Sequence, residues 1–265
     1  MRSLKVFVVI VCAVSITALG IEAADTLTGS STRLLGQLIS NEATCPEGMI
    51  ATPQLLSVGC IDQYEASPSA TCPHKSPKNP IETSANTDDP SCAAISKAET
   101  VPWRFITRDQ AATMCLRAGK RLPSNEEWYQ LALGTPDTGV CNTTSDEVAE
   151  TGSSVACKSA VGVYDAVGNV WEWTSEEAIH GMYNGRNLPK SGYVVEVDRA
   201  GIATLTSEDD ASAYGDDYFW SRQEGVSGMI RGGFYRSLED AGVFSTHADT
   251  APSTATAGLG FRCVL

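Results

Sequence analysis

The sequence predicts an α+β fold in which two helices accompany small, irregular β-sheets and long loops. Two capping boxes, Thr107 with Gln110 and Ser124 with Glu127, predict helices over residues 107–119 and 124–133. After the second helix the chain is rich in Gly, Ser, Thr and Asp with short apolar runs, which favours strands and loops. This separation of helices from strands indicates an α+β arrangement.

Residues 1–24 have the layout of a secretory signal peptide. Two basic residues precede an apolar stretch, and we expect cleavage near Gly20 or Ala24. The alternative is a retained membrane anchor, but Ser15 and Thr17 interrupt a run already shorter than the roughly 20 residues that a spanning helix needs. We do not expect lipidation of Cys12, because a bulky valine precedes it. These features predict a secreted or cell-surface protein without membrane insertion after cleavage.

Without Cys12 the chain keeps eight cysteines, an even number that suits disulfides in an oxidising compartment. Their spacing does not match a zinc site, because no close cysteine pair is matched by a second pair or by histidines. Proximity along the chain suggests three bridges: Cys45 with Cys60, Cys72 with Cys92, and Cys141 with Cys157.

The predicted mature chain divides into a flexible spacer at residues 25–44 and one domain at residues 45–265, although its length also allows two small domains. The domain should open with a hairpin in residues 45–65, followed by an irregular loop over residues 68–92. The formal charge of -13 disfavours binding to nucleic acid or to anionic lipid.

Four strings occur in order: GKRLPSNEEW at residues 119–128, GVYDAVGNVWEWT at 162–174, RGGFYRS at 231–237 and GLGFRC at 258–263. Together they resemble the formylglycine-generating enzyme, or sulfatase-modifying factor, family, over most of the chain from Cys45 onward. The resemblance implies a C-type-lectin-like fold with little regular secondary structure. It also implies a bridge between Cys115 and Cys263, which by the chain-entropy model adds about 4 to 5 kcal/mol.

In that family the second string binds a calcium ion through one side chain, two backbone carbonyls and a carboxylate. These ligands correspond to Asp165, Gly168, Val170 and Glu172. The alternative is that the two carboxylates only accept hydrogen bonds from backbone donors in a tight turn. A bound ion would stabilise the fold and would not perform chemistry.

The family's enzyme uses a pair of cysteines after its GG motif to hold copper and activate oxygen. No cysteine lies between Cys157 and Cys263, so we expect neither copper nor formylglycine chemistry. Relatives that use iron need clustered histidines, whereas His74, His180 and His247 are scattered, so we expect no iron. The resemblance is therefore to an enzyme family, but this chain is expected to be non-catalytic.

Residues 231–265 resemble the variable region of proteins that are diversified by retroelements. That region keeps a frame, here RGG, AGVF, AP and LGFRC, while adenine-directed mutagenesis rewrites Asn codons between the frame pieces. Such rewriting cannot produce Lys, Gln, Glu, Met or Trp, and between Phe234 and Gly258 only Glu239 breaks this limit. The neighbouring residues 221–230 do contain Gln, Glu and Met. The alternative is an ordinary polar loop before the last strand.

The rewritten positions are predicted to be exposed and to bind ligand, because Tyr, Phe and Arg act as interface anchors while small polar residues adapt around them. These positions are Phe234, Tyr235, Arg236, Ser237, Leu238, Asp240, Ser245, His247, Asp249, Ser253, Thr254 and Thr256.

The sequence therefore favours an exported, non-catalytic protein that displays a diversified C-terminal surface to a protein or glycan ligand on another cell or surface. Two alternatives stay open. One is a fixed extracellular binding or structural module, and the other is an oxidase of the formylglycine-generating type with altered chemistry.

Overall fold

The computed structural model describes residues 45–52, 58–137 and 139–265. The predicted signal peptide and spacer lie outside the described residues. Cys45–Leu265 forms one unit of the chain. Within its described part, three α-helices accompany three β-sheets, so the predicted α+β class is confirmed.

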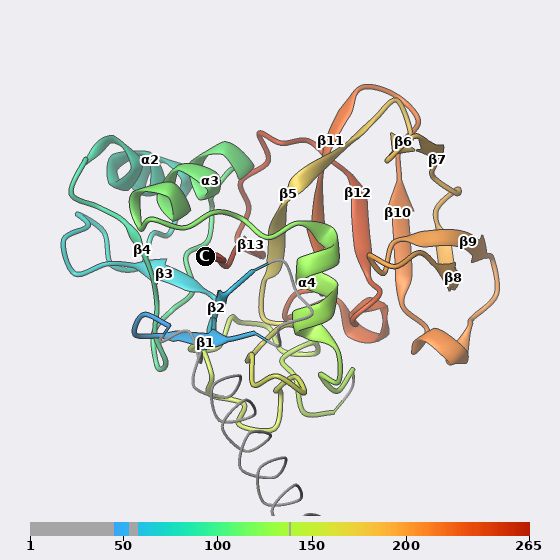
Figure 1. Cartoon of the computed structure of the whole chain (residues 1–265), viewed down its shortest axis with the longest axis horizontal. Coiled ribbons are helices and arrows are strands. Elements are labelled where there is room, and N and C mark those ends of the chain that lie inside the picture. The colour runs from blue at the N-terminus through green and yellow to red at the C-terminus, as the bar shows by residue number, and fades with distance from the viewer. Residues whose placement is uncertain (1–44, 53–57, 138) are drawn as a thin grey trace, which may run out of the picture. The chain divides into compact units, whose positions relative to one another are not determined.

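The largest sheet has nine strands in the order β7-β6-β5-β11-β12-β10-β8-β9, with β13 paired to β5 (Figure 1). Neighbouring strands are antiparallel, except that β10 with β12 and β13 with β5 are parallel. This sheet is larger than the small sheets that we expected. Its strands are β5 (Trp171–Ile179), β6 (Met182–Tyr183), β7 (Arg186–Asn187), β8 (Gly192–Val197), β9 (Ala203–Ser207), β10 (Tyr218–Ser221), β11 (Val226–Arg231), β12 (Thr246–Thr250) and β13 (Leu259–Gly260).

Two small sheets lie on the other side of β5 from β11 and β12 (Figure 1). In one of them β1 (Met49–Ala51) pairs with β2 (Cys60–Asp62), which is the predicted hairpin. In the other, β3 (Ala66–Pro68) pairs with β4 (Ala94–Ser96). Val264 bridges both Ile61 and Arg121, so the last residues of the chain lie beside its first strands.

Both predicted helices form at their capping boxes. α3 (Arg108–Arg117) begins after Thr107, and α4 (Asn125–Ala132) begins after Ser124. In each, the cap hydroxyl accepts the N–H of the third helical residue, whose side chain accepts the N–H of the cap residue. Local side-chain chemistry therefore places both helix starts.

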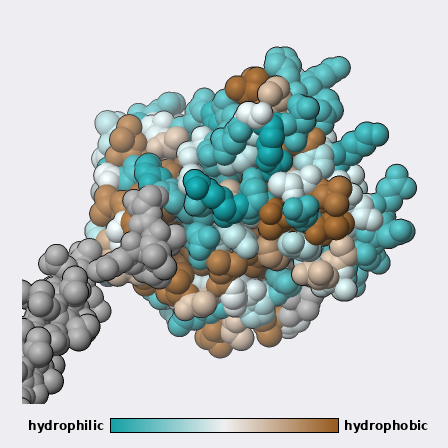
Figure 2. Space-filling view, turned by 45° about the vertical axis from the view of Figure 1, so that its right-hand side comes forward, coloured by the Kyte–Doolittle hydropathy of each residue, from teal (hydrophilic) through white to brown (hydrophobic). Residues whose placement is uncertain are grey.

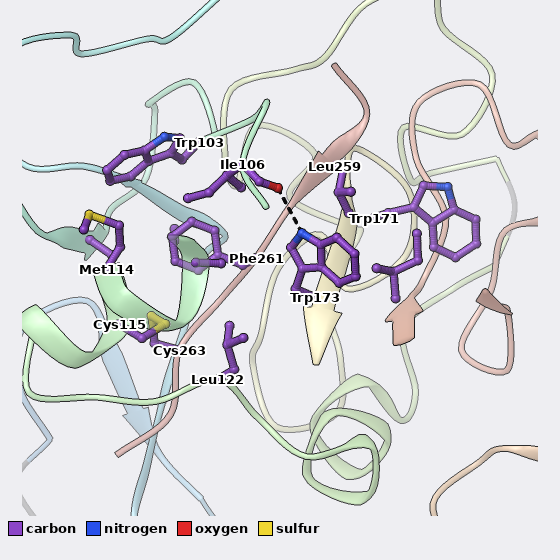
Figure 3. Close-up of a cluster of buried hydrophobic side chains, with 14 of the residues drawn as sticks. Trp103, Ile106, Met114, Cys115, Leu122, Trp171, Trp173, Leu259, Phe261 and Cys263 are labelled. Carbon is purple, nitrogen blue, oxygen red and sulfur yellow. Dashed lines mark hydrogen bonds between the residues drawn. A yellow bond between two sulfur atoms is a disulfide. The ribbon is translucent and has the colours of Figure 1, made fainter. Parts of the chain in front are cut away.

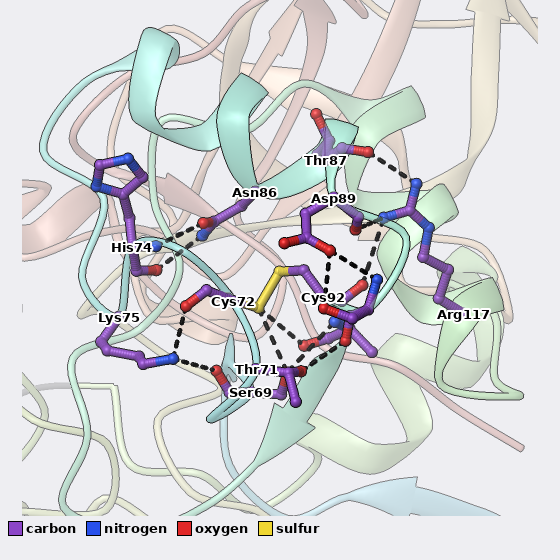
Figure 4. The surroundings of a disulfide bond; sticks show 12 residues. Ser69, Thr71, Cys72, His74, Lys75, Asn86, Thr87, Asp89, Cys92 and Arg117 are labelled. Carbon is purple, nitrogen blue, oxygen red and sulfur yellow. Dashed lines mark hydrogen bonds between the residues drawn. A yellow bond between two sulfur atoms is a disulfide. The ribbon is translucent and has the colours of Figure 1, made fainter.

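A third helix, α2 (Pro80–Asp88), corrects the expectation of two helices and of an irregular loop over residues 68–92. Asn79 caps it by accepting the N–H of Glu82, and Pro80 suits its first turn. Its buried positions are Thr83 and Asn86, so it has no apolar stripe that could reveal it in the sequence. Asn86 holds the preceding loop through both backbone groups of His74 (Figure 4).

Four disulfides brace the unit, and they join the same pairs that the sequence suggested. The bridge between Cys72 and Cys92 lies next to α2 and α3, where Arg117 donates to the carbonyl oxygens of Thr87 and Asp89 (Figure 4). The bridge between Cys115 and Cys263 lies in the main hydrophobic cluster.

That cluster packs α3 against β5 and the last strand. Trp173, on β5, is fully buried, and its Nε1–H donates to the Ile106 carbonyl at 3.0 Å (Figure 3). Trp171 lies at one end of the cluster, beyond Leu259 (Figure 3). A separate cluster, which includes Phe219 and Ala248, covers one face of β10 and β12. The opposite face of these strands carries the site described next.

Candidate binding face

The predicted binding positions do not share one environment. Four are exposed: Arg236, Leu238, Ser253 and Thr256. Five are half-buried: Phe234, Asp240, His247, Asp249 and Thr254. The remaining three, Tyr235, Ser237 and Ser245, are buried, so the prediction that they are exposed is wrong.

The three buried residues hold the segment in place. Tyr235 donates its N–H to the Asn169 carbonyl at 3.1 Å, and its ring packs against Phe234. The Ser237 hydroxyl accepts the N–H of Phe234 at 3.0 Å. The Ser245 hydroxyl donates to the carbonyl of Asp240. Hydroxyls that bond to nearby backbone stabilise turns. In the sequence, a serine with this structural role looks the same as a rewritten serine on the surface.

Two aspartates that sequence reasoning missed hold the next turn of the segment. The Asp217 carboxylate accepts the N–H of Phe244 at 2.7 Å, and the Asp137 carboxylate accepts the N–H of Val243. Burial, and then the charge of Asp137, raise the pKa of Asp217 well above its ordinary value. A Cβ at Gly242 would lie 1.8 Å from Asp217 Oδ1, so this frame glycine makes room for the carboxylate.

A row of rings, here called the ring ladder, crosses the outer face of three neighbouring strands. It consists of Tyr193 on β8, Tyr218 and Trp220 on β10, and His247 on β12. Trp220 stacks on His247 with a 4.0 Å centroid distance, and Tyr218 lies 4.7 Å from Trp220 and 5.1 Å from Tyr193. Alternate strand residues point to opposite faces, so the ladder and the buried cluster occupy opposite faces of β10.

Trp171 connects the ring ladder to the start of the terminal segment. Its ring lies edge-on to His247 and Trp220, at centroid distances of 4.8 and 5.9 Å. The backbone N–H of Trp171 donates to the carbonyl of Gly258 at 2.8 Å, and a Cβ at Gly258 would lie 2.4 Å from the Phe234 ring. Phe234 therefore lies beside Gly258 and packs against the cluster that contains Trp171. The alternating string YFWS at 218–221 is the sequence signal for these rings, but the pattern of codon rewriting points only to residues 231–265.

Carboxylates surround the ring ladder. His247 Nδ1 lies 2.8 Å from Asp249 Oδ1; burial alone would raise the pKa of Asp249, but the hydrogen bond and charge of His247 lower it. A hydrogen bond from Tyr193 to Asp210 raises the pKa of the tyrosine. Asp240 lies near enough to interact electrostatically with both His247 and Tyr193. The face is thus aromatic and acidic.

The exposed start of the terminal segment lies against another loop. Arg236 forms an ion pair with Asp146 at 3.0 Å, and the N–H of Leu238 donates to the Thr143 carbonyl at 2.9 Å. Leu238 is 60% exposed and has a φ of 56°, a left-handed conformation that a bulky residue rarely adopts. In Figure 2, which brings the β8–β9 side forward, hydrophobic residues form small groups among hydrophilic ones.

The predicted calcium ligands lie in a buried charge network. Asp165 accepts the N–H of Gly152 at 2.6 Å, and burial raises its pKa to about 6. Glu172 accepts hydrogen bonds at 2.7 Å from both Arg262 Nε and Trp128 Nε1. Asp165 thus accepts a backbone N–H, as the alternative of a structural turn requires. The donors to Glu172 are side chains instead, and the Arg262 guanidinium already supplies it with a cation. Glu172 in this arrangement fits a structural role better than a calcium site.

The network contains a third acid. Glu65 is fully buried and accepts hydrogen bonds from the Asn169 side chain and the Val170 N–H. Burial, and then the charges of Asp165 and Glu172, raise its pKa well above its ordinary value. Among the described residues, no group of three His, Cys, Asp or Glu side chains is arranged to hold a metal ion. Calcium binding through Gly168 and its neighbours stays a prediction.

The comparisons with known proteins agree with the resemblance read from the sequence. Residues 137–265 match the family model of the sulfatase-modifying factor enzyme 1-like domain. The match contains three of the four strings and confirms the resemblance for that part of the chain. No curated protein matches the chain. No described helix is long and apolar enough to span a membrane.

Several solved structures are similar at low identity. The Major Tropism Determinant P3c variant is 18% identical with a TM-score of 0.47, over 83% of this chain and 53% of its own. Treponema denticola variable protein 1 is 14% identical with a TM-score of 0.45, over 82% and 93%. PvdO from Pseudomonas aeruginosa is 16% identical with a TM-score of 0.43, over 82% and 89%. The chain spans about half the length of the tropism determinant that it matches.

Proposed function

We propose that the chain is an exported, non-catalytic protein that binds a ligand on another cell or surface through a diversified C-terminal face. Four disulfides support export, because such bonds form and persist in oxidising compartments. The missing cysteine pair after the GG motif supports a role without formylglycine chemistry. Variable residues on a rigid scaffold are a common way to build a binding surface.

The observation that carries this proposal is Leu238. It is 60% exposed, so its side chain gains little from packing, and its φ of 56° is unfavourable for a bulky residue, so stability does not explain its presence. Asn is one of the few residues that tolerate this conformation. A template Asn at this position, rewritten to Leu, accounts for both facts. An exposed apolar residue at a strained position is then kept for contact with a ligand.

The division between exposed and buried positions supports the same proposal and yields a test. In one library, Arg236, Leu238, Ser253 and Thr256 are replaced by the residues that rewritten Asn codons can encode. In a matched library, the same codons replace Tyr235, Ser237 and Ser245. We expect most members of the first library to keep the parental melting temperature, since exposed substitutions usually change stability by about 0.5 kcal/mol or less. Most members of the second should lose several degrees.

Equal losses in both libraries would contradict a tolerant binding face.

Diversification itself has a separate test in the DNA of the locus. We expect a near-copy of the segment that encodes residues 231–265, mismatched mainly at adenines, beside a reverse transcriptase gene. Without such a copy, the fixed extracellular module becomes the better account. Oxygen consumption with copper and a cysteine-containing peptide would instead identify an oxidase.

A further inference from the structure

We propose that the ring ladder and its neighbouring carboxylates form a docking site for an arginine side chain of a protein partner. The inference rests on the proposed binding function. It adds fixed residues outside the terminal segment to the proposed binding face, and it assigns a positive charge to the partner. Tyr193, Tyr218 and Trp220 precede residue 231, whereas His247 and Asp249 lie within the candidate variable region.

Trp220 packs against the main hydrophobic cluster, whereas Tyr193 and Tyr218 belong to none of the clusters formed by the described residues. Phe219 and Ala248 already pack the inner face of β10 and β12, where they are fully buried. On the outer face, Tyr218 and Trp220 are half-buried. Neither the Trp220 indole N–H nor the Tyr218 hydroxyl has a hydrogen-bond partner among the residues that the structure describes. Amphipathic rings with free polar ends are typical anchors of protein interfaces.

The charges around the rings select a cation. Asp249, Asp240 and Asp210 each interact with a ladder residue. Arg222 influences Asp249, but its guanidinium already donates to the Val226 carbonyl and the Ser227 hydroxyl. The chain as a whole has a formal charge of -13, which attracts basic partners over a distance. A neutral glycan could stack on the rings and donate hydroxyl hydrogen bonds to these carboxylates, but it would leave their negative charge without a counter-charge.

Arginine fits this combination better than lysine. Its planar guanidinium packs along aromatic rings and bonds to carboxylates through several N–H groups at once, whereas an ammonium is a compact, strongly hydrated charge. A protein loop carrying arginine would therefore contact Trp220 and pair with Asp249. The neighbouring rewritten positions would then set which loop is accepted.

The test follows the indole N–H signal of Trp220 by two-dimensional NMR of the full chain, with the signal assigned through Trp220→Phe. The probe is N-acetyl-arginine amide, with N-acetyl-glutamine amide and methyl glucoside as neutral controls. We expect a saturable shift with the arginine probe, weakened at least threefold by 500 mM salt, and no saturable shift with either control. Asp249→Asn should weaken binding at least fivefold.

Asp109→Asn is the matched control, because it removes the same charge from an exposed site on α3. It should leave the affinity within about twofold of the parent. An equal loss in both variants would attribute the binding to net charge and overturn the site. A response to the glucoside alone would assign the rings to a sugar and also overturn it. The library and locus tests do not depend on Trp220, so this site can fail while the proposed function stands.

Discussion

Gly242→Ala tests whether the buried carboxylate of Asp217 shapes the terminal segment. Gly242 does not have a positive φ, so alanine suits its backbone and the added methyl group is the only change. That methyl would lie 1.8 Å from Asp217 Oδ1 and 2.4 Å from Cγ, which forces the carboxylate to move. The N–H of Phe244 then loses its acceptor. A buried donor left without a partner costs about 1 to 3 kcal/mol, and displacing the buried Asp217 carboxyl adds to the cost.

We therefore expect Gly242→Ala to lower the free energy of unfolding by about 2 to 4 kcal/mol. For a domain of this size the melting temperature should fall by roughly 5 to 15 °C, measured by calorimetry. Gly59→Ala is the matched control, because Gly59 also lacks a positive φ and a Cβ there would lie 3.9 Å from the Leu265 carbonyl oxygen, an ordinary contact distance. A Gly242→Ala protein that melts within 1 °C of the parent would show that Asp217 does not hold this turn.

Three further predictions concern the buried acid network, the disulfides and the strained leucine. When a chelator keeps calcium away, folding raises the pKa of Asp165 from 3.8 to about 6. The stabilisation that comes from the protonated carboxyl is therefore complete below pH 3.8 and is lost as pH rises through about 6. The free energy of unfolding of the parent should therefore fall by about 3 kcal/mol across this window, and Asp165→Asn should remove that fall. If the predicted site binds calcium, added calcium should raise the parent's melting temperature at pH 7. An unchanged melting temperature would leave the acids with a purely structural role. Replacing both Cys115 and Cys263 by Ala should lower the free energy of unfolding by about 5 kcal/mol in a urea titration. Removing the bridge between Cys72 and Cys92, whose sequence separation is 20, should lower it by about 3 kcal/mol. The intact mature protein should show no free thiols when denatured. Leu238→Asn should be about 0.5 to 1 kcal/mol more stable than Leu238→Ala, and equal stability would argue against backbone strain at this position.

The sequence by itself determined the features that depend on neighbouring residues. The starts of α3 and α4 follow from capping boxes, in which a hydroxyl and an acceptor three residues later bond to nearby N–H groups. The first hairpin follows from short apolar runs separated by turn residues. α2 is the exception. Its cap at Asn79 is visible in the sequence, but its polar composition hides it from a search for apolar periodicity.

The candidate site divides in the same way. Residue types restricted by codon rewriting pointed to the terminal segment, and the structure places nine of its twelve predicted positions at least partly in solvent. Residue type could not separate exposed Ser253 from buried Ser245, because a serine is equally suited to water and to a nearby backbone acceptor. Burial depends on what packs above the residue.

Only the tertiary structure brought together residues that lie far apart in the chain. The ring ladder forms because β8, β10 and β12 pair side by side, which sets Tyr193 opposite Tyr218 and Trp220 opposite His247. Asp137 and Asp217 meet the terminal turn across at least 25 intervening residues. Such contacts depend on strand order and register, whose information is spread over the whole chain. Composition and spacing describe local segments, so they cannot reveal which side chains of distant strands share a face.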